Sequence, residues 1–298
     1  MGPPRTKLAF IGLGRMGLPM CARLISAGFE VRATDLRSEP RRAVVSLGGG
    51  WAQSAAEACT DADIAVTVLP GPDEVAAVAD EVLDALPRGA CWIEMSTASP
   101  AVARSVKAAA AVRELSVVEA PVGGGPAEAG QGRLLAFAGG EAGDLERCRP
   151  VLDALAARVF HVGPSGSGYA VKLFVNALWF TQAAASAELL TVGDKLGLDL
   201  DVLRQAFNLG ASGGRFVAED LGSLLDGDNL TSFSLARCLE ELASVQALGR
   251  ELGVELDLIS AVTDVHRSAL RHYGDVDGEL LGARWVAERA GVELERGG

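Results

Sequence analysis

Lys172 and Asn176 are the residues whose types and spacing are best suited to chemistry. They lie four positions apart, directly after the glycine-rich run GPSGSG, and at that spacing two side chains project from one face of a helix. A lysine can give a proton to a substrate oxygen or take one from it, and its charge helps to polarise that oxygen. At the start of a helix, the positive end of the backbone dipole favours loss of the ammonium proton. We therefore expect an acid/base site on a helix beginning near residue 169, the alternative being a surface lysine on a solvated helix face.

A second candidate site is a glycine-rich run near the N-terminus. It consists of Gly12, Leu13, Gly14, Arg15, Met16 and Gly17, after a strand-like segment and before a helical one. Its glycines permit a tight turn, approach of the backbone to a pyrophosphate, and close helix packing. Asp35 ends the next strand-like segment, 18 residues after Gly17, where a carboxylate can accept hydrogen bonds from the ribose hydroxyls of adenosine. The combination predicts a dinucleotide-binding site.

Asp35 also bears on which dinucleotide binds. A carboxylate at this position pairs with a free ribose diol and repels a 2′-phosphate, which favours NAD. Arg37, Arg41 and Arg42 follow closely, and a guanidinium folded over the ribose could hold the phosphate of NADP. The other interpretation of these arginines is a solvated loop and helix face. We expect NAD, with NADP as the second possibility.

Two later strand ends should reach the same crevice, since ligands of open α/β sheets bind beyond the carboxyl ends of the strands. Leu69 and Pro70 could pack on the adenosine side, and the hydroxyls of Ser96 and Thr97 could bind the nicotinamide ribose. Ser96 and Thr97 also make a good helix-start signal with Pro100, and both interpretations stay open. The next strand runs into Gly123, Gly124 and Gly125, whose bare backbone could offer N–H groups to a substrate anion or could be purely conformational.

The elements that must position these residues change character along the chain. From Lys7 to about Val162, seven short β-rich segments alternate with Ala-rich helical ones (LAFIGL, EVRATD, IAVTVL, CWIEMS, SVVEAP, LLAFAG and VFHVG). This alternation predicts a doubly wound α/β domain, a parallel sheet with helices on both faces. After Gly163 only amphipathic stretches follow, at 169–196, 199–210, 214–225, 233–253, 256–273 and 277–290, which predicts an all-helical domain. We place the boundary between residues 1–164 and 165–298.

Composition restricts the partners and the compartment. The formal charge of −12 argues against nucleic acid, because a basic surplus is needed to release counterions. Five cysteines lie far apart without a CxxC, as in a reducing cytosol, and we see no signal segment and no run long enough to span a membrane. The three histidines and the acidic clusters lack the spacing of metal ligands. We expect a cytoplasmic protein that binds neither metal nor membrane.

These motifs, in this order, resemble the β-hydroxyacid dehydrogenases, the group that includes 3-hydroxyisobutyrate dehydrogenase. The resemblance covers nearly the whole chain, and its most specific carriers are EAPVGGGPAEAGQGRL at 119–134 and GSGYAVKLFVN at 166–176; FIGLGRMGLPM at 10–20, VLPGPDEV at 68–75 and EMSTASP at 94–100 add to it. It implies NAD(P)-dependent interconversion of a β-hydroxyacid or related alcohol and its semialdehyde or ketone. Lys172 is then the catalytic acid/base, Asn176 helps to hold the substrate, and the helical domain contributes to a homodimer or homotetramer.

Two departures from the family bear on the substrate. The family usually carries serine where this chain has Gly123, so a hydroxyl contact to the substrate carboxylate is lost. The Lys-Asp-Leu of a C-terminal helix becomes Glu240-Glu241-Leu242, which replaces a cation by an anion. A carboxylate at residue 240 would repel a simple hydroxyacid unless Arg237, on the same helix face, offsets it. The acceptor could therefore be larger, neutral or amino-bearing.

Two other functions fit parts of this pattern. Imine reductases share the architecture, but they generally lack the lysine at the position of Lys172. A dinucleotide-binding protein without turnover would explain Gly123 and Glu240, but it would not explain intact Lys172 and Asn176. The oxidoreductase interpretation is preferred for this reason.

Overall fold

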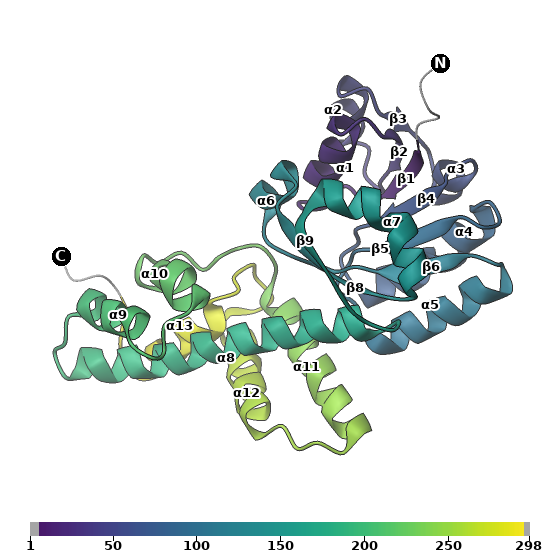
Figure 1. Ribbon diagram of the computed structural model, residues 1–298. Coiled ribbons are helices and arrows are strands. Elements are labelled where there is room, and N and C mark those ends of the chain that lie inside the picture. The colour runs from purple at the N-terminus through teal and green to yellow at the C-terminus, as the bar shows by residue number, and fades with distance from the viewer. Residues whose placement is uncertain (1–5, 295–298) are drawn as a thin grey trace. The chain divides into compact units, whose positions relative to one another are not determined.

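The chain folds into two compact units, Met1–Lys172 and Leu173–Gly298. This is seen in a computed structural model that describes residues 6–294 (Figure 1). The division falls inside the long helix α8 (Ser167–Lys195), which carries residues of both units. The domain boundary expected at residues 164 and 165 lies just before this helix and stays a prediction.

The first unit is built on one sheet. Its strands in the described residues are β1 (Lys7–Ile11), β2 (Glu30–Thr34), β3 (Gly50–Trp51), β4 (Ile64–Thr67), β5 (Cys91–Glu94), β6 (Ser116–Glu119), β7 (Val122–Gly123), β8 (Leu134–Gly139) and β9 (Ala156–Gly163). The strand order is β3-β2-β1-β4-β5-β6-β8-β7, with β9 on β8. Strands β1 to β6 pair in parallel, so their carboxyl ends share one edge of the sheet, as the predicted crevice requires.

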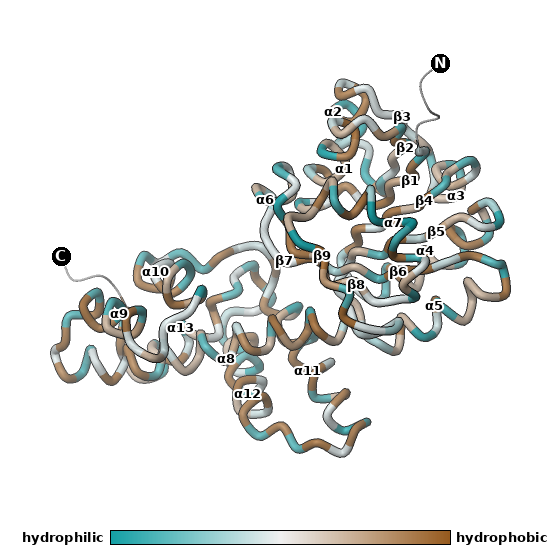
Figure 2. Tube along the Cα trace, viewed as in Figure 1, coloured by the Kyte–Doolittle hydropathy of each residue, from teal (hydrophilic) through white to brown (hydrophobic). Residues whose placement is uncertain are grey.

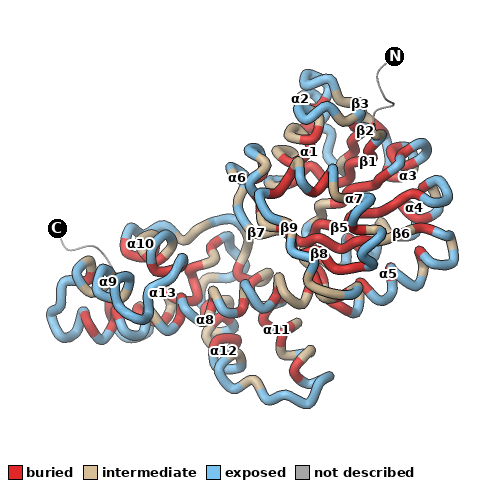
Figure 3. Tube along the Cα trace, viewed as in Figure 1, coloured by how far each residue is buried: buried red, intermediate tan, exposed pale blue. Residues whose placement is uncertain are grey.

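Alternation along the strands explains why both faces of the sheet are covered. Leu8 and Phe10 point to one face, where they join a core with residues of α1 (Gly17–Ser26) and α7 (Ala142–Leu155). Ala9 and Ile11 point to the other face, toward α3 (Ala55–Cys59), α4 (Pro72–Ala85) and α5 (Pro100–Val112). The period of two is that of a pleated strand, and Figure 3 shows β4 and β5 as buried. The doubly wound fold is confirmed.

One part of the sheet differs from the parallel arrangement that was expected. Strand β8 runs antiparallel to β6 and β7. The reason is that β7 continues in the direction of β6 and is joined to β8 by the short helix α6 (Pro126–Gln131), so β8 returns alongside them. The two-residue strands β3 and β7 were not predicted, because two residues carry no readable alternation.

The second unit is helical throughout its described residues, apart from one isolated bridge between Ser234 and Asp277. It contains the C-terminal part of α8, then α9 (Leu200–Leu209), the π-helical turn Phe216–Asp220, α10 (Leu221–Leu225), α11 (Leu235–Leu252), α12 (Asp257–Tyr273) and α13 (Leu281–Glu288). Apolar and polar residues alternate along α12 in Figure 2, and Val262, His266 and Ala269 on one face of this helix are buried in the core of this unit. The predicted all-helical second half is confirmed.

Candidate functional site

The glycine run 12–17 forms the turn between β1 and α1. Gly12 has φ +93°, and a Cβ there would collide with the carbonyl oxygen of Val68. A Cβ on Gly17 would collide with the carbonyl oxygen of Gly12, so this glycine permits the close start of α1. No described atom lies within 4 Å of a Cβ built on Gly14, which leaves its backbone open to a ligand. Each glycine thus meets one of the requirements of a dinucleotide turn.

The other residues of the turn have different surroundings. Leu13 is buried, Met16 is half-buried just before α1, and Arg15 is exposed. The backbone N–H of Leu13 donates to Oδ2 of Asp35 at 2.7 Å. The carboxylate that follows β2 is therefore tied directly to the glycine turn.

Asp35 also accepts two hydrogen bonds from Arg37. The Arg37 backbone N–H and Nε reach Oδ1 at 2.8 and 3.1 Å. Burial raises the pKa of Asp35, but the hydrogen bonds from Arg37 and Leu13 outweigh it and hold the pKa below its usual range. Asp35 is thus an anion at neutral pH. A carboxylate has about four acceptor positions, so these three donors leave capacity for a ribose hydroxyl.

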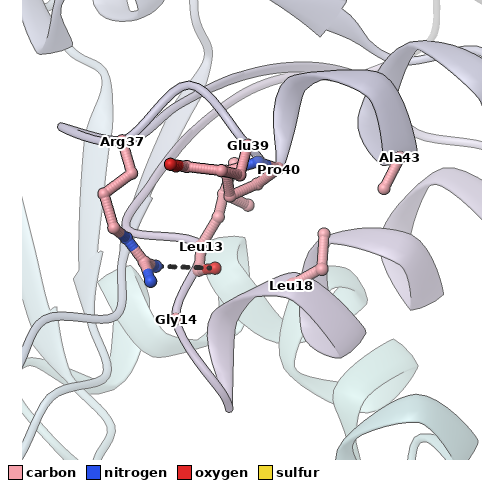
Figure 4. Close-up of a pocket in the computed structure, with 7 residues that line it drawn as sticks. All are labelled: Leu13, Gly14, Leu18, Arg37, Glu39, Pro40 and Ala43. Carbon is pink, nitrogen blue, oxygen red and sulfur yellow. Dashed lines mark hydrogen bonds between the residues drawn. The ribbon is translucent and has the colours of Figure 1, made fainter.

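A cavity of about 440 Å³ adjoins this turn (Figure 4). It is lined by Leu13, Gly14, Leu18, Arg37, Glu39, Pro40 and Ala43. Arg37 Nη2 contacts the carbonyl oxygen of Leu13 at 3.4 Å across one side of it. Its volume falls in the range of small-molecule sites. The bare turn, the cavity and the Asp35 carboxylate together fit the adenosine half of a dinucleotide, whereas Arg41 and Arg42 lie exposed on α2 (Arg41–Ser46).

The next two strand ends are joined by a hydrogen bond. The backbone N–H of Leu69 donates to Ser96 Oγ at 2.8 Å. Leu69 is half-buried beside Gly12, and Pro70 is exposed. Ser96 is buried, Thr97 is half-buried, and the N-cap of α5 is Ser99. The helix-start role therefore belongs to Ser99, and the Ser96 hydroxyl links strand ends.

The three glycines after β6 are not equivalent. A Cβ on Gly123 would make ordinary contacts with Phe137 and Leu135 at 3.6 and 3.8 Å, so a side chain is tolerated there. Gly124 has φ +110°, which favours glycine. The N–H of Gly125 donates to Glu128 Oε2 at 2.9 Å. This N–H group is therefore already hydrogen-bonded at the start of α6 and is not available to a substrate anion.

Glu119, at the end of β6, forms hydrogen bonds with the chain at the start of α8. Its carboxylate accepts the backbone N–H groups of Gly166 and Gly168 and the hydroxyl of Ser165. Burial raises its pKa, and these hydrogen bonds oppose the shift. The GPSGSG run is thereby fastened to the sheet.

Glu94, at the end of β5, receives the side chain of Tyr169 from the first turn of α8. The Tyr169 hydroxyl donates to Glu94 Oε2. Glu94 also accepts the backbone N–H of Ser96 at 2.9 Å and the hydroxyl of Thr67 at 3.3 Å. Burial raises the pKa of Glu94 and of Tyr169. The pair is almost completely removed from solvent.

Lys172 and Asn176 both lie on α8, one turn apart, and both are half-buried. Lys172 is the last residue of the first unit and Asn176 belongs to the second. The Asn176 Nδ2 donates to Glu241 Oε2 on α11 at 2.6 Å. Glu241 is buried, so this hydrogen bond fixes the orientation of the asparagine amide.

Glu240, next to Glu241 on α11, has a different environment. Its Oε2 accepts from Arg237 Nη1 at 2.5 Å, and its side chain is 58% exposed. Arg237 lies one turn earlier on the same helix and offsets the charge of Glu240. The sequence analysis named Arg237 as the residue that could offset the negative charge of Glu240, and this ion pair is present.

Known proteins match both halves of this arrangement. Residues 7–163 match the NAD binding domain of 6-phosphogluconate dehydrogenase, and residues 166–281 match the NAD-binding region of NADP-dependent 3-hydroxyisobutyrate dehydrogenase. NAD-dependent L-serine dehydrogenase of Pseudomonas aeruginosa is 36% identical over 216 residues, which is 72% of each chain. The 3-sulfolactaldehyde reductase of Escherichia coli is 32% identical over 266 residues, 88% of this chain and 89% of that protein. The chain belongs to the β-hydroxyacid dehydrogenase family.

A solved structure of a β-hydroxyacid dehydrogenase agrees with this assignment. Mycobacterium tuberculosis 3-hydroxyisobutyrate dehydrogenase with L-serine has a TM-score of 0.86 and 30% identity, and the match covers 96% of this chain and 99% of that one. The protein is thus an NAD(P)-dependent oxidoreductase acting on CH–OH groups. NAD, with NADP as the second possibility, is the cofactor set of its relatives, as predicted.

Sequence reasoning missed the acids that hold this site together. Glu94, Glu119 and Glu241 were visible inside quoted motifs but were given no role of their own. The available signal was position, since Glu94 and Glu119 are the last residues of apolar strands, where a buried charge needs partners. Which donors they meet depends on contacts 46 to 75 residues apart, and spacing alone does not reveal such contacts.

Proposed function

We propose that the protein interconverts a β-hydroxyacid and its semialdehyde or ketone, with Lys172 as the acid/base and Asn176 holding the substrate. When bound, the nicotinamide supplies or takes up the hydride. The Lys172 ammonium gives a proton to the carbonyl oxygen during reduction, and the neutral amine takes the hydroxyl proton during oxidation. In the cationic state it also stabilises negative charge that develops on that oxygen.

The observation that carries this proposal is the position of Lys172. It follows directly after the turn that is hydrogen-bonded to the carboxyl ends of β5 and β6. Those ends belong to the edge of the sheet that also carries the glycine turn and Asp35. A half-buried lysine there can reach a substrate bound over the strand ends, and Gly12, Gly14 and Asp35 would hold the dinucleotide.

For the substrate class we propose small β-hydroxyacids, including amino-bearing ones such as L-serine. The Arg237 and Glu240 pair presents both charges on α11, which suits a zwitterion better than a lone cation would. Similarity to a serine dehydrogenase supports this choice. The backbone N–H of Gly124 would contact the carboxylate.

The test is a cofactor-coupled screen that follows absorbance of the reduced nicotinamide. Hydroxyacids, semialdehydes, amino alcohols and cyclic imines are compared, with Lys172→Ala beside the unmodified protein. We expect turnover of a hydroxyacid, lowered by about 10²-fold or more in Lys172→Ala, with cofactor affinity retained. Lys107→Ala, which removes an exposed lysine paired with Glu141, is the matched control. Turnover of cyclic imines alone, or unchanged turnover in Lys172→Ala, would refute the proposal.

We also propose that the protein is a cytoplasmic homodimer or homotetramer. The second unit exposes the apolar side chains of Leu189 and Val192 on one face of α8 and of Leu196 directly after it, at helical spacing suited to a second copy. Five free cysteines are compatible with a reducing compartment. None of the described helices is both long and apolar enough to cross a membrane. Light scattering of the protein and of Leu189→Lys tests the assembly, since a smaller mass for the variant is expected.

A further inference from the structure

We propose that Glu94 and Glu119 are positioning residues that fix the first turn of α8, and with it Lys172. This inference rests on the proposed function, in which Lys172 is the acid/base. The two acids accept hydrogen bonds from the same turn. Glu119 accepts them from backbone N–H groups, and Glu94 accepts one from the side chain of Tyr169. Neither acid touches the reacting atoms in this proposal; both act through Lys172.

The space around Glu119 is built for a carboxylate. A Cβ on Gly139 would collide with Glu119 Oε1, and a Cβ on Gly168 would lie 3.0 Å from Glu119 Cγ. Neither glycine has a positive φ, so both are needed for space and not for backbone conformation. Ser165 Oγ donates to the second carboxylate oxygen at 3.2 Å. The position of the Glu119 carboxylate therefore determines where the first turn of α8 lies.

The Glu94 side of the turn is held just as firmly. Tyr169 is 2% exposed and Glu94 is 1% exposed. For such buried groups, leaving a donor or acceptor without a partner costs more free energy of folding than a hydrogen bond normally contributes. Glu94 is itself held by the backbone N–H of Ser96. The tyrosine ring can therefore move only if a buried polar pair is broken.

The same network reaches the strand ends expected to hold the nicotinamide ribose. Ser96, which donates to Glu94, accepts the backbone N–H of Leu69 through its hydroxyl. Lys172 follows Tyr169 within one helical turn. The backbone at these strand ends and the first turn of α8, which carries Tyr169 just before Lys172, thus share one set of buried hydrogen bonds. Misplacement by about 1 Å can cost a reaction about 10²-fold, so this coupling matters for rate.

Tyr169→Phe is the mildest test, because it removes one hydroxyl and leaves Glu94 with Ser96 and Thr67. We expect kcat to fall by about 10-fold or more, while the Kd for NADH stays within about two-fold. Tyr273→Phe is the matched control. It removes the chain's other tyrosine hydroxyl, which also donates to a glutamate, Glu288, at 2.7 Å. An equal kcat for Tyr169→Phe and Tyr273→Phe would overturn the positioning role.

A double-mutant cycle with Lys172→Ala separates positioning from general stability. If Tyr169 acts through Lys172, Tyr169→Phe has no further effect on kcat in the Lys172→Ala background. A full additional loss there, with Lys172→Ala itself impaired, overturns the positioning role and leaves the proposed function standing. Unchanged turnover in Lys172→Ala alone overturns the proposed function first.

Gly139→Ala tests the Glu119 side, because a Cβ there collides with Glu119 Oε1 and with the backbone N of Gly168, and so disturbs the contact between this carboxylate and the first turn of α8 without removing the carboxylate. We expect a loss of kcat that is again absent in the Lys172→Ala background. Gly143→Ala, in the same unit, is the control, since a Cβ there meets no described atom within 4 Å. Thermal unfolding of each variant verifies that it is folded. A Gly139→Ala protein that unfolds like the unmodified protein and keeps its kcat would contradict the role of Glu119.

Discussion

Arg37, which lines the cavity beside the glycine turn, is paired with Asp35, and its Nε lies 3.1 Å from Asp35 Oδ1. The sequence left two interpretations of Arg37 open, a solvated loop residue and a partner for the phosphate of NADP, and both stay predictions. Arg37 donates to the carboxylate that is expected to select a ribose diol. Its side chain nevertheless remains 61% exposed, so it could turn toward a phosphate if Asp35 were absent.

We expect a lower Kd for NADH than for NADPH, because Asp35 repels a 2′-phosphate and keeps Arg37 occupied. Asp35→Ala should raise the Kd for NADH by about 10-fold, the usual effect of losing a hydrogen bond to a charged group. It should also lower the Kd for NADPH by releasing Arg37. Fluorescence titration of both cofactors measures this.

The double variant Asp35→Ala/Arg37→Ala is the control for this cofactor prediction. It should lose the improvement for NADPH, since no guanidinium remains beside the ribose. Tighter binding of NADPH than of NADH by the unmodified protein would show that the assignment to Asp35 is wrong.

Gly123→Ser should restore the hydroxyl that the family usually carries. The position has room for a Cβ and no positive φ, so the fold should be unaffected. We expect the KM for a small hydroxyacid to fall by about 10-fold, because a hydrogen bond to a carboxylate contributes about 1.5 kcal/mol. Gly124→Ala is the contrasting variant, and its φ of +110° predicts loss of stability instead. An unchanged KM for Gly123→Ser would place the substrate carboxylate elsewhere.

More of the fold than of the site could be predicted from the sequence. Strand alternation and helical periodicity are local, so seven of the strands and the helical second half were predictable. Gly12, Gly14 and Gly17 were predictable because their spacing encodes a local turn. The contacts of Tyr169 with Glu94 and of Asn176 with Glu241 were not, since they join distant segments. Ser99 capping α5 shows the same limit on a smaller scale, because three hydroxyl residues compete within four positions.

His266 predicts how stability depends on pH. It is buried, and its Nδ1–H donates to the Val262 carbonyl oxygen at 2.9 Å. Burial lowers the pKa of His266 below its ordinary value of 6.5. Below pH of about 6.5 the unfolded chain therefore binds a proton that the folded chain does not. Stability should be complete above that pH and fall by about 1.4 kcal/mol per pH unit as pH drops toward the folded pKa.

Urea unfolding at pH 7.5 and pH 5.5 measures this loss for the unmodified protein and for His266→Gln. Glutamine can still donate to Val262 but does not titrate, so the variant should lose less stability between the two pH values. Other groups contribute equally to both proteins and cancel in the difference. An equal loss in both proteins would exclude His266 as the source.

The last prediction concerns Glu240, where the chain departs in charge from its family. We expect Glu240→Lys to raise kcat/KM for small anionic hydroxyacids by about five-fold or less and to lower it for amino-bearing substrates. The physical reason is that the change replaces an anion by a cation and removes the ion pair between residue 240 and Arg237. The modest size follows from the 58% exposure of the Glu240 side chain, because solvent screens such charges.

Two controls separate a substrate contact from a general charge effect of residue 240. Glu219→Lys breaks a similar exposed pair, with Arg215 Nε 2.7 Å from Glu219 Oε2, and changes the net charge by the same amount. If Glu240 lies near the substrate, only Glu240→Lys changes the preference between anionic and amino-bearing substrates, and the change persists in part at high salt. If it lies on a solvated helix face, both variants respond alike and the response fades as salt is added, because a Debye length of about 10 Å at 0.1 M removes distant effects first. Equal responses of the two substrate classes to Glu240→Lys would therefore remove residue 240 from substrate recognition.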